Sequence, residues 1–224
     1  PKFQVNGDRI IAPLDILDLT MTQIGEYQRV GYDYIITALK KKYKTLSDPN
    51  KGLSYTVLEP PLQALNMIYP HTDINKSKEK DLYMYLYGKR GLDRVMRYDE
   101  STMSDFRYED KTIQNFGKIF APDNIGRYSA KIANICNSIA NSKGIVFVYS
   151  QYIAGGAVPI ALSLEEMGIT RYGSGNSLFA KAAAPPIDAI TMEPADGVAK
   201  FNAAKYIMIT GDKMLSPKNI DDLI

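Results

Sequence analysis

The sequence contains few of the residues that build metal sites and disulfide frameworks. Its 224 residues include one cysteine, Cys136, one histidine, His71, and no tryptophan. A lone cysteine excludes an intrachain disulfide. One cysteine and one histidine are also too few to form a zinc site made of Cys and His ligands alone. Cys136 lies on the apolar face of a predicted helix, and no nucleophile is placed to use His71. Both residues are therefore predicted to be structural.

Strong charge and long apolar runs are also missing. The formal net charge is only +2, so the composition argues against a histone-like or ribosomal protein. No apolar run approaches the roughly 20 residues that span a bilayer, and no signal peptide opens the chain. We therefore expect no membrane partner. The chain begins Pro-Lys-Phe without a methionine, and we expect it to be a fragment of a longer protein.

The composition changes near residue 126. Before it, tyrosines and charged residues interleave and apolar residues recur at helical spacing, which predicts a mainly helical segment over residues 1–125. A strand or loop is expected over the first 20 residues. The predicted helices cover residues 23–44, 60–67, 77–87 and 111–116.

The second part, residues 126–224, alternates helical patterns with apolar runs. The run at 145–149 is typical of a strand that is buried on both faces of a parallel sheet. A helix, a strand, a helix, a loop and a further strand in this order predict an α/β fold with a right-handed parallel crossover. The predicted helices cover residues 128–142 and 157–167, and the other strands 169–172 and 206–210.

Polar residues follow two of the predicted strands. Ser150 stands at the end of the first, before Gly155 and Gly156, which open a helix. Ligands of open α/β sheets bind at the carboxyl ends of strands, and a hydroxyl beside a helix N-terminus suits a phosphate. The alternative is a strand end whose polar groups are satisfied by its own turn.

Thr210, Gly211, Asp212 and Lys213 follow the second strand. Glycine lets a ligand approach the backbone closely, and the neighbouring donors would suit a phosphate. A tight turn without a ligand is an equally good interpretation of these four residues.

Several segments of the sequence resemble a known protein family. Residues 143–152, which read Lys-Gly-Ile-Val-Phe-Val-Tyr-Ser-Gln-Tyr, followed by Gly155-Gly156 and by residues 161–168, resemble motif IV of superfamily 2 helicases. More narrowly, the chain resembles the helicase-like proteins of large nucleocytoplasmic DNA viruses. That group includes the small subunit of the poxvirus early transcription factor and nucleoside triphosphatase I.

Four further segments carry this narrower resemblance, in the family's order. Met21-Thr22-Gln23 with Tyr27 resembles "MS-x-x-Q-x-x-Y", and residues 63–70 resemble "Q-x-S-N-x-x-Y-P". Residues 126–132 resemble "K-Y-S-x-K-I". Residues 206–212, with Leu215-Ser216 a few positions on, resemble "Y-x-x-I-T-G-D".

The resemblance implies a partial RecA-like parallel sheet with flanking helices over residues 126–224, an incomplete second helicase lobe. A family-specific helical segment over residues 1–125 would precede it. In the wider superfamily the two strand ends touch the nucleic-acid backbone, which here implies contacts from Tyr149, Ser150, Gln151, Thr210, Gly211 and Asp212.

The sequence lacks the motifs that hold a nucleotide. It has no Gly-x-x-x-x-Gly-Lys-Ser/Thr loop and no Asp-Glu-x-His for magnesium. We therefore expect no cofactor in this fragment, and ATP and Mg²⁺ only in a longer parent that hydrolyses ATP. Since such a motor closes two lobes over ATP, the fragment alone is predicted to be inactive.

Two further groups of charged residues are candidates for function. A basic face formed by Lys89, Arg90, Arg94 and Arg97, interleaved with tyrosines, would suit a single strand. The alternative is a surface cluster that pairs with Asp93, Asp99 and Glu100. Glu165 and Glu166 are adjacent, and since neighbouring helix residues do not face each other, they are assigned no acid–base role.

The sequence predicts two alternative functions, one as part of a motor enzyme and one as a protein-interaction module. The first is the C-terminal motor lobe of a viral DNA helicase or translocase, used in transcription or genome handling. Its partners would be single- or double-stranded DNA and the first RecA-like lobe. The second is an interaction module on a degenerate RecA-like scaffold that binds viral RNA polymerase or virion proteins. The resemblance implies a location in the virion or the viral factory. A phosphate-binding α/β domain of unrelated function is a third possibility.

Overall fold

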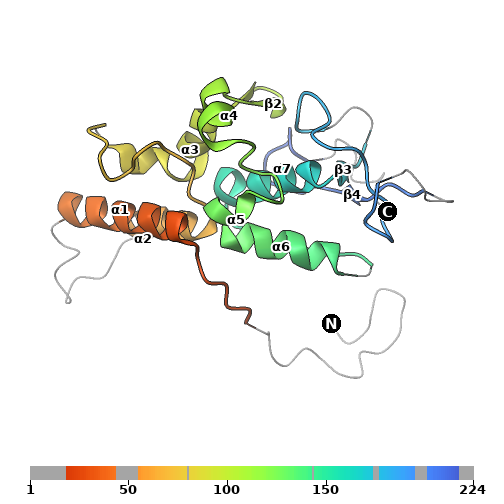
Figure 1. Cartoon of the computed structure of the whole chain (residues 1–224), viewed down its shortest axis with the longest axis horizontal. Helices are drawn as coiled ribbons and strands as arrows, with labels where there is room; N and C mark the ends of the chain where they lie inside the picture. Colours follow the sequence, from red (N-terminus) through yellow and green to blue (C-terminus); the bar gives the residue numbers. More distant parts are fainter. Residues whose placement is uncertain are drawn as a thin grey trace.

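The computed structural model describes residues 19–43, 55–79, 81–142, 144–173, 177–194 and 201–216 (Figure 1). The expected strand or loop at the start of the chain lies outside the described residues, except for its last two positions. The α-helices are α1 (Glu26–Lys42), α2 (Tyr55–Asn66), α3 (Gly88–Val95), α4 (Asp110–Phe116), α5 (Ile125–Tyr128), α6 (Ala130–Ala140) and α7 (Val158–Glu166). A 3₁₀ helix η2 (Leu82–Tyr85) and a π-helical turn η3 (Ile153–Ala157) complete the helical elements.

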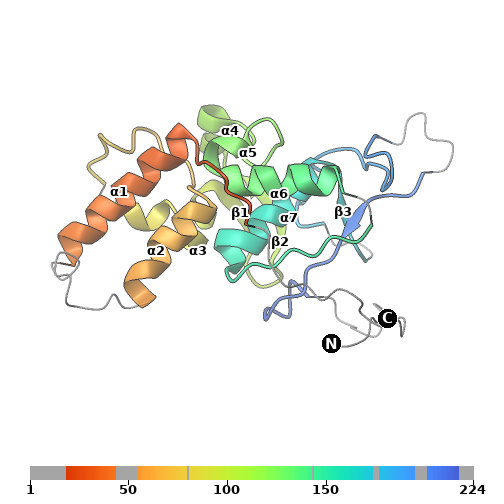
Figure 2. The same cartoon turned by 90° about the horizontal axis from the view of Figure 1, so that it is seen from below.

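Helices α1 and α2 pack side by side at one end of the molecule and share a small apolar core (Figures 1 and 2). α1 confirms the helix expected from the apolar spacing. A Cβ on Gly31 would lie 2.6 Å from the Ile68 side chain, so the close approach of α1 to residue 68 requires glycine. α2 begins five residues before Pro60, so both Pro60 and Pro61 lie inside the helix, where each removes a backbone donor.

The helix predicted over residues 77–87 is wrong. This stretch contains Asp81, whose φ of 57° interrupts any regular helix, and the short η2. The helical turns come later, in α3, because Gly91 packs against the Tyr69 ring, where a Cβ would approach Cδ2 to 2.2 Å. Strands β1 (Met96–Asp99) and β2 (Ser104–Tyr108) then form an antiparallel hairpin.

The helices predicted in the second part agree with α6 and α7. Ser129 caps α6: its Oγ accepts a hydrogen bond from the Ile132 N–H at 2.9 Å. Such a cap stabilises a helix by about 1 kcal/mol. α7 is buried along its whole length and packs against α6.

The predicted sheet is only partly present. One parallel pair joins β3 (Thr170–Arg171) to β4 (Lys205–Tyr206), and the described residues contain no RecA-like parallel sheet. The expectation that residues 145–149 form a buried strand is wrong. They follow α6 as an extended trace (Figure 2), and Ile145, Phe147 and Tyr149 are 103%, 87% and 79% exposed. A strand needs a paired backbone, and the described part of the chain supplies none here.

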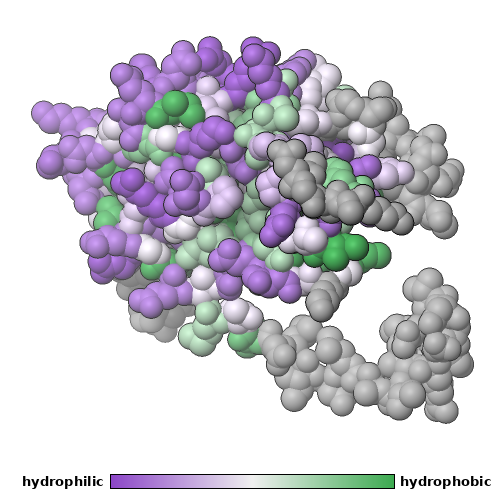
Figure 3. Space-filling view, turned by 45° about the vertical axis from the view of Figure 1, so that its right-hand side comes forward, coloured by the Kyte–Doolittle hydropathy of each residue, from purple (hydrophilic) through white to green (hydrophobic). Residues whose placement is uncertain are grey.

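The larger apolar core crosses the compositional boundary at residue 126. Met67 and Phe106, from before it, pack in the same cluster as Val158 and Leu215. On the face shown in Figure 3 hydrophilic side chains predominate, and hydrophobic groups are exposed in separate patches. Among the described helices, none has the length and apolar character needed to cross a membrane.

Candidate nucleic-acid interface

The two predicted strand ends have the same local geometry. Ser150 Oγ accepts a hydrogen bond from the Tyr152 N–H at 3.3 Å and donates to the Tyr152 carbonyl at 3.0 Å. Thr210 Oγ1 does the same with Asp212, at 3.1 Å in both directions. Each hydroxyl is thus engaged by its own turn, as the alternative interpretation of both motifs expected.

The turns leave several backbone donors open, among them one at each apex. The N–H groups of Gln151 and Gly211 have no hydrogen-bond partner among the residues that the structure describes. Both residues are exposed. An exposed N–H at a tight turn can donate to a phosphate oxygen without breaking any bond of the turn.

The glycines near the two turns serve different purposes. A Cβ on Gly156 would lie 2.0 Å from Ser150 Oγ, and one on Gly155 would lie 2.4 Å from Gln63 Oε1. These glycines are needed for packing within the chain. A Cβ on Gly211 would meet nothing within 4 Å, and its φ is not in the left-handed region. Neither packing nor backbone conformation within the described chain therefore requires glycine at 211.

Side chains beside the first turn link it to the helical part. Gln151 Nε2 donates to the Tyr55 hydroxyl at 2.8 Å, and the Tyr55 and Tyr152 hydroxyls lie 3.4 Å apart. Burial, together with the hydrogen bond to Tyr55, raises the pKa of Tyr152 to about 12. Tyr149 is exposed, so its ring is accessible to a ligand at the surface.

Three of the segments that carry the family resemblance meet in the structure, although they lie far apart in the sequence. Tyr27 packs edge to face against Tyr128, with ring centroids 5.3 Å apart. The neighbouring Gln28 is fully buried: its amide donates to the Ala64 carbonyl at 3.1 Å, and its Oε1 accepts from the Ala130 N–H at 3.1 Å. Ser129 Oγ donates to the Asn66 carbonyl. The helical segment and α6 are therefore held together by buried polar contacts.

The first strand end joins the same arrangement. The Tyr69 hydroxyl donates to the Ala154 carbonyl in η3 at 2.7 Å. The Gln63 side chain packs against Gly155 in the same turn and against Gly88 at the start of α3. Contacts from α2 and the residues after it thus position the turn that follows Ser150.

Acidic residues neutralise most of the predicted basic face. Lys89 Nζ lies 3.0 Å from both Asp93 and Glu100. Arg94 forms a bidentate pair with Glu79 at 2.8 and 2.9 Å. Arg97 approaches two further carboxylates, those of Glu109 and Asp110, at 3.3 and 3.4 Å, whereas Arg90 donates to Met84 Sδ. These pairs favour the surface-cluster alternative, although Asp99 takes no part in it and bonds to Ser101 instead.

Glu165 and Glu166, to which the sequence assigned no acid–base role, are both buried, which their positions in the sequence did not predict. Glu165 accepts hydrogen bonds from Ser177 Oγ, the Leu178 and Phe179 N–H groups and the Tyr206 hydroxyl, at 2.6 to 3.0 Å. Burial first and the carboxylate second raise the pKa of Tyr206. Glu165 thereby fastens the segment around residue 178 to β4.

Glu166 points to a different set of partners. It accepts from the Tyr108 hydroxyl at 2.9 Å and lies 3.1 Å from Lys118 Nζ. Burial, followed by the Glu166 charge, raises the pKa of Tyr108. The two glutamates diverge, as expected for neighbours on a helix, and each ties α7 to another part of the chain.

No group of three or more His, Cys, Asp or Glu residues that could hold a metal ion occurs within the described ranges. Comparison with known proteins adds no relative, because no family model, no curated protein and no solved structure matches this chain.

Proposed function

We propose that this chain is part of the second lobe of an ATP-driven DNA helicase or translocase, and that it contacts the nucleic-acid backbone through two turns. The first turn comprises Tyr149, Ser150 and Gln151, and the second Thr210, Gly211 and Asp212. From the resemblance, we propose that this activity serves viral transcription or genome handling. ATP and Mg²⁺ would bind only with the first lobe.

One observation carries the proposal: each turn presents an exposed, unpartnered backbone N–H at its apex, on Gln151 and on Gly211. Backbone donors bind phosphate regardless of sequence, as a motor that moves along a strand requires. The open space around Gly211 lets a phosphate approach without steric hindrance. The parallel β3–β4 pair supports the α/β part of the proposal.

A second function, docking of a protein partner, is favoured by residues 145–149. Five consecutive apolar residues with extended backbone are exposed there, and the described chain supplies no strand beside them. Such a segment is a template for strand addition by another polypeptide. The neutralised basic face removes one source of DNA affinity, and this also favours the interaction module.

Binding of a fluorescent single-stranded oligonucleotide, followed by anisotropy at two salt concentrations, distinguishes the two functions. Neutral backbone N–H groups release fewer counterions than lysine or arginine, so contacts at the two turns predict an affinity that falls only weakly between about 50 and 200 mM salt. The double variant Ser150→Ala/Gly211→Val is expected to weaken binding further. Gly126→Ala is the control, because a Cβ there would make only an ordinary contact, 3.7 Å from Ala133.

Binding that the double variant leaves unchanged would contradict the proposed contacts. Absence of DNA binding, combined with loss of a protein partner on mutation of residues 145–149, would establish the second function in its place.

A further inference from the structure

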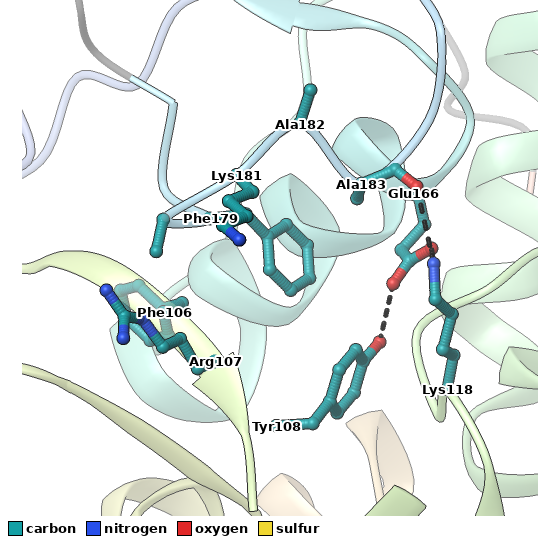
Figure 4. Close-up of a pocket in the computed structure, with 10 residues that line it drawn as sticks. Phe106, Arg107, Tyr108, Lys118, Glu166, Phe179, Lys181, Ala182 and Ala183 are labelled. Atoms are coloured by element: carbon teal, nitrogen blue, oxygen red, sulfur yellow. Dashed lines mark hydrogen bonds and ion pairs between the residues drawn. The ribbon is translucent and has the colours of Figure 1, made fainter.

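A pocket away from the two turns lies between the β-hairpin, α7 and the segment that Glu165 holds (Figure 4). Its volume is about 350 Å³, within the range of small-ligand sites. Tyr108 and Phe179 form its aromatic walls, with the buried Phe106, whose ring stacks on Tyr98, beneath them. The walls are joined by backbone hydrogen bonds, from the Phe106 N–H to the Leu178 carbonyl at 2.8 Å and from the Ala180 N–H to the Phe106 carbonyl at 3.1 Å. The pocket is therefore a built part of the fold.

The charged residues of the pocket divide into two groups. Glu166 and Lys118 neutralise each other at 3.1 Å, and Glu166 also accepts the Tyr108 hydroxyl. Arg107 and Lys181 are exposed and have no ion-pair partner within the described parts of the chain. In Figure 4 these two side chains lie on one side of the Phe179 ring, and the Glu166–Lys118 pair lies on the other.

The position of Arg107 adds a further argument for an anion. Arg107 is paired with Arg97 directly across the hairpin. Like charges directly opposite each other on a hairpin are destabilising. Arg97 is compensated by Glu109 at 3.3 Å, but no described carboxylate compensates Arg107. An anion bound at Arg107 would supply the missing charge.

From this arrangement we infer that the pocket binds a nucleoside phosphate, with the planar base against Tyr108 and Phe179 and the phosphate between Arg107 and Lys181. Two unpaired cations match a phosphomonoester, which carries about −1.5 to −2 at pH 7, better than they match a single carboxylate. Arginine forms two parallel hydrogen bonds to phosphate oxygens, and lysine acts as a point charge. The ligand can be a free mononucleotide or the phosphorylated end of a strand, since both present the same chemistry.

Ligand-observed NMR titration of the whole chain with AMP, adenosine and inorganic phosphate tests the inference. We expect AMP to bind about tenfold or more tightly than adenosine and than inorganic phosphate, because only AMP uses both halves of the pocket. Lys181→Ala and Arg107→Gln are each expected to weaken AMP binding about five- to tenfold. Lys40→Ala, which removes an exposed lysine on α1, is the matched control and should leave AMP binding unchanged.

A tetranucleotide with and without a 5′-phosphate distinguishes a free mononucleotide from the phosphorylated end of a strand as the ligand. Tighter binding of the phosphorylated tetranucleotide than of AMP identifies a strand end as the ligand, and the reverse order identifies a free nucleotide. Equal binding of AMP and adenosine would overturn the inference, as would an equal loss of affinity in Lys40→Ala and Lys181→Ala. Absence of AMP binding up to about 5 mM, a concentration that detects even millimolar affinity, would also overturn it.

Discussion

Ser150 and Thr210 form the same hydrogen-bonded turn at the ends of two separate extended segments. In each turn the hydroxyl bonds to both backbone groups of the residue two positions on. The hydroxyls therefore shape the turns, and the backbone donors of Gln151 and Gly211 are left for a ligand. This division changes the role of the serine and threonine from direct phosphate contacts to residues that position the backbone.

Ser129→Ala is expected to lower the free energy of unfolding by about 1–2 kcal/mol, because it removes the cap of α6 and the bond to the Asn66 carbonyl. Urea denaturation measures the change. Ser142→Ala is the control: its Oγ makes only an exposed bond to the Ile139 carbonyl. A loss no larger than that of the control would show that the cap does not stabilise the fold.

Glu165→Ala is expected to destabilise the chain by about 3 kcal/mol or more, because four donors lose their buried acceptor at once. Limited proteolysis should then cut near Leu178 sooner than in the wild-type protein. Glu193→Ala, which removes an exposed carboxylate, should change neither stability nor cleavage. Unchanged cleavage in Glu165→Ala would mean that another contact holds this segment.

The chain is expected to lose stability as the pH rises above about 10, the pKa of an unperturbed tyrosine. Burial raises the pKa of Tyr108 and Tyr206 in the folded state, so their stabilising effect is complete below the unfolded pKa and is lost as the pH rises. Exposed tyrosines ionise first, and the last part of the rise in absorbance at about 295 nm should coincide with the loss of circular dichroism, because Tyr108 and Tyr206 ionise as the chain unfolds. Ionisation of every tyrosine near pH 10 without loss of helix would contradict this expectation.

Asp188→Asn is expected to destabilise the chain at neutral pH. The Asp188 carboxylate accepts hydrogen bonds from the N–H groups of Asn202, Thr191 and Ile190, and these bonds lower its pKa. The stability that they contribute is present above the unfolded pKa of about 3.9 and is lost as the pH falls through the folded value. The difference in melting temperature between the variant and wild type should therefore narrow below about pH 4. A constant difference across this range would argue against a charge effect.

Phe147→Lys is expected to reduce self-association without changing the melting temperature, because Phe147 is 87% exposed within an unpaired apolar segment. Analytical ultracentrifugation over a range of concentrations measures the effect. Ile190→Lys is a matched control, since Ile190 is also 87% exposed but lies outside the 145–149 segment. Equal changes in both variants would show that exposed apolar area in general, and not this segment, drives association.

The sequence predicted those elements whose pattern depends on local residues. α6 was predicted well because its apolar face is regular; the structure adds that Ser129, which the sequence analysis had placed inside the helix, is its cap. The 77–87 stretch was mispredicted because long-range packing overrides local helix propensity there. Gly88 packs against Gln63 and Gly91 against Tyr69, and these contacts favour a helix that starts at residue 88. An apolar run at 145–149 predicts a strand but cannot show whether another strand lies beside it.

The candidate sites were also predicted only in part. The residue types predicted where the two turns lie, but the hydrogen bonds of the hydroxyls and the open apex N–H groups depend on the folded backbone. The partners of Arg94 and Glu165 lie at other places in the sequence, so spacing along the chain could not reveal them. The Arg107–Lys181 juxtaposition depends on the pairing of β2 with the segment after Leu178, which no local pattern encodes.

Zero-length ultraviolet crosslinking of a single-stranded oligonucleotide, with the adducts mapped by mass spectrometry, tests the central claim most directly. The exposed Tyr149 ring lies beside the first turn and is a suitable acceptor. The account predicts adducts on the peptide that contains Tyr149, and it predicts that Gly211→Val reduces their yield while Gly126→Ala does not. Adducts confined to the α3 and β1 region around Arg94, with none at Tyr149, would contradict it.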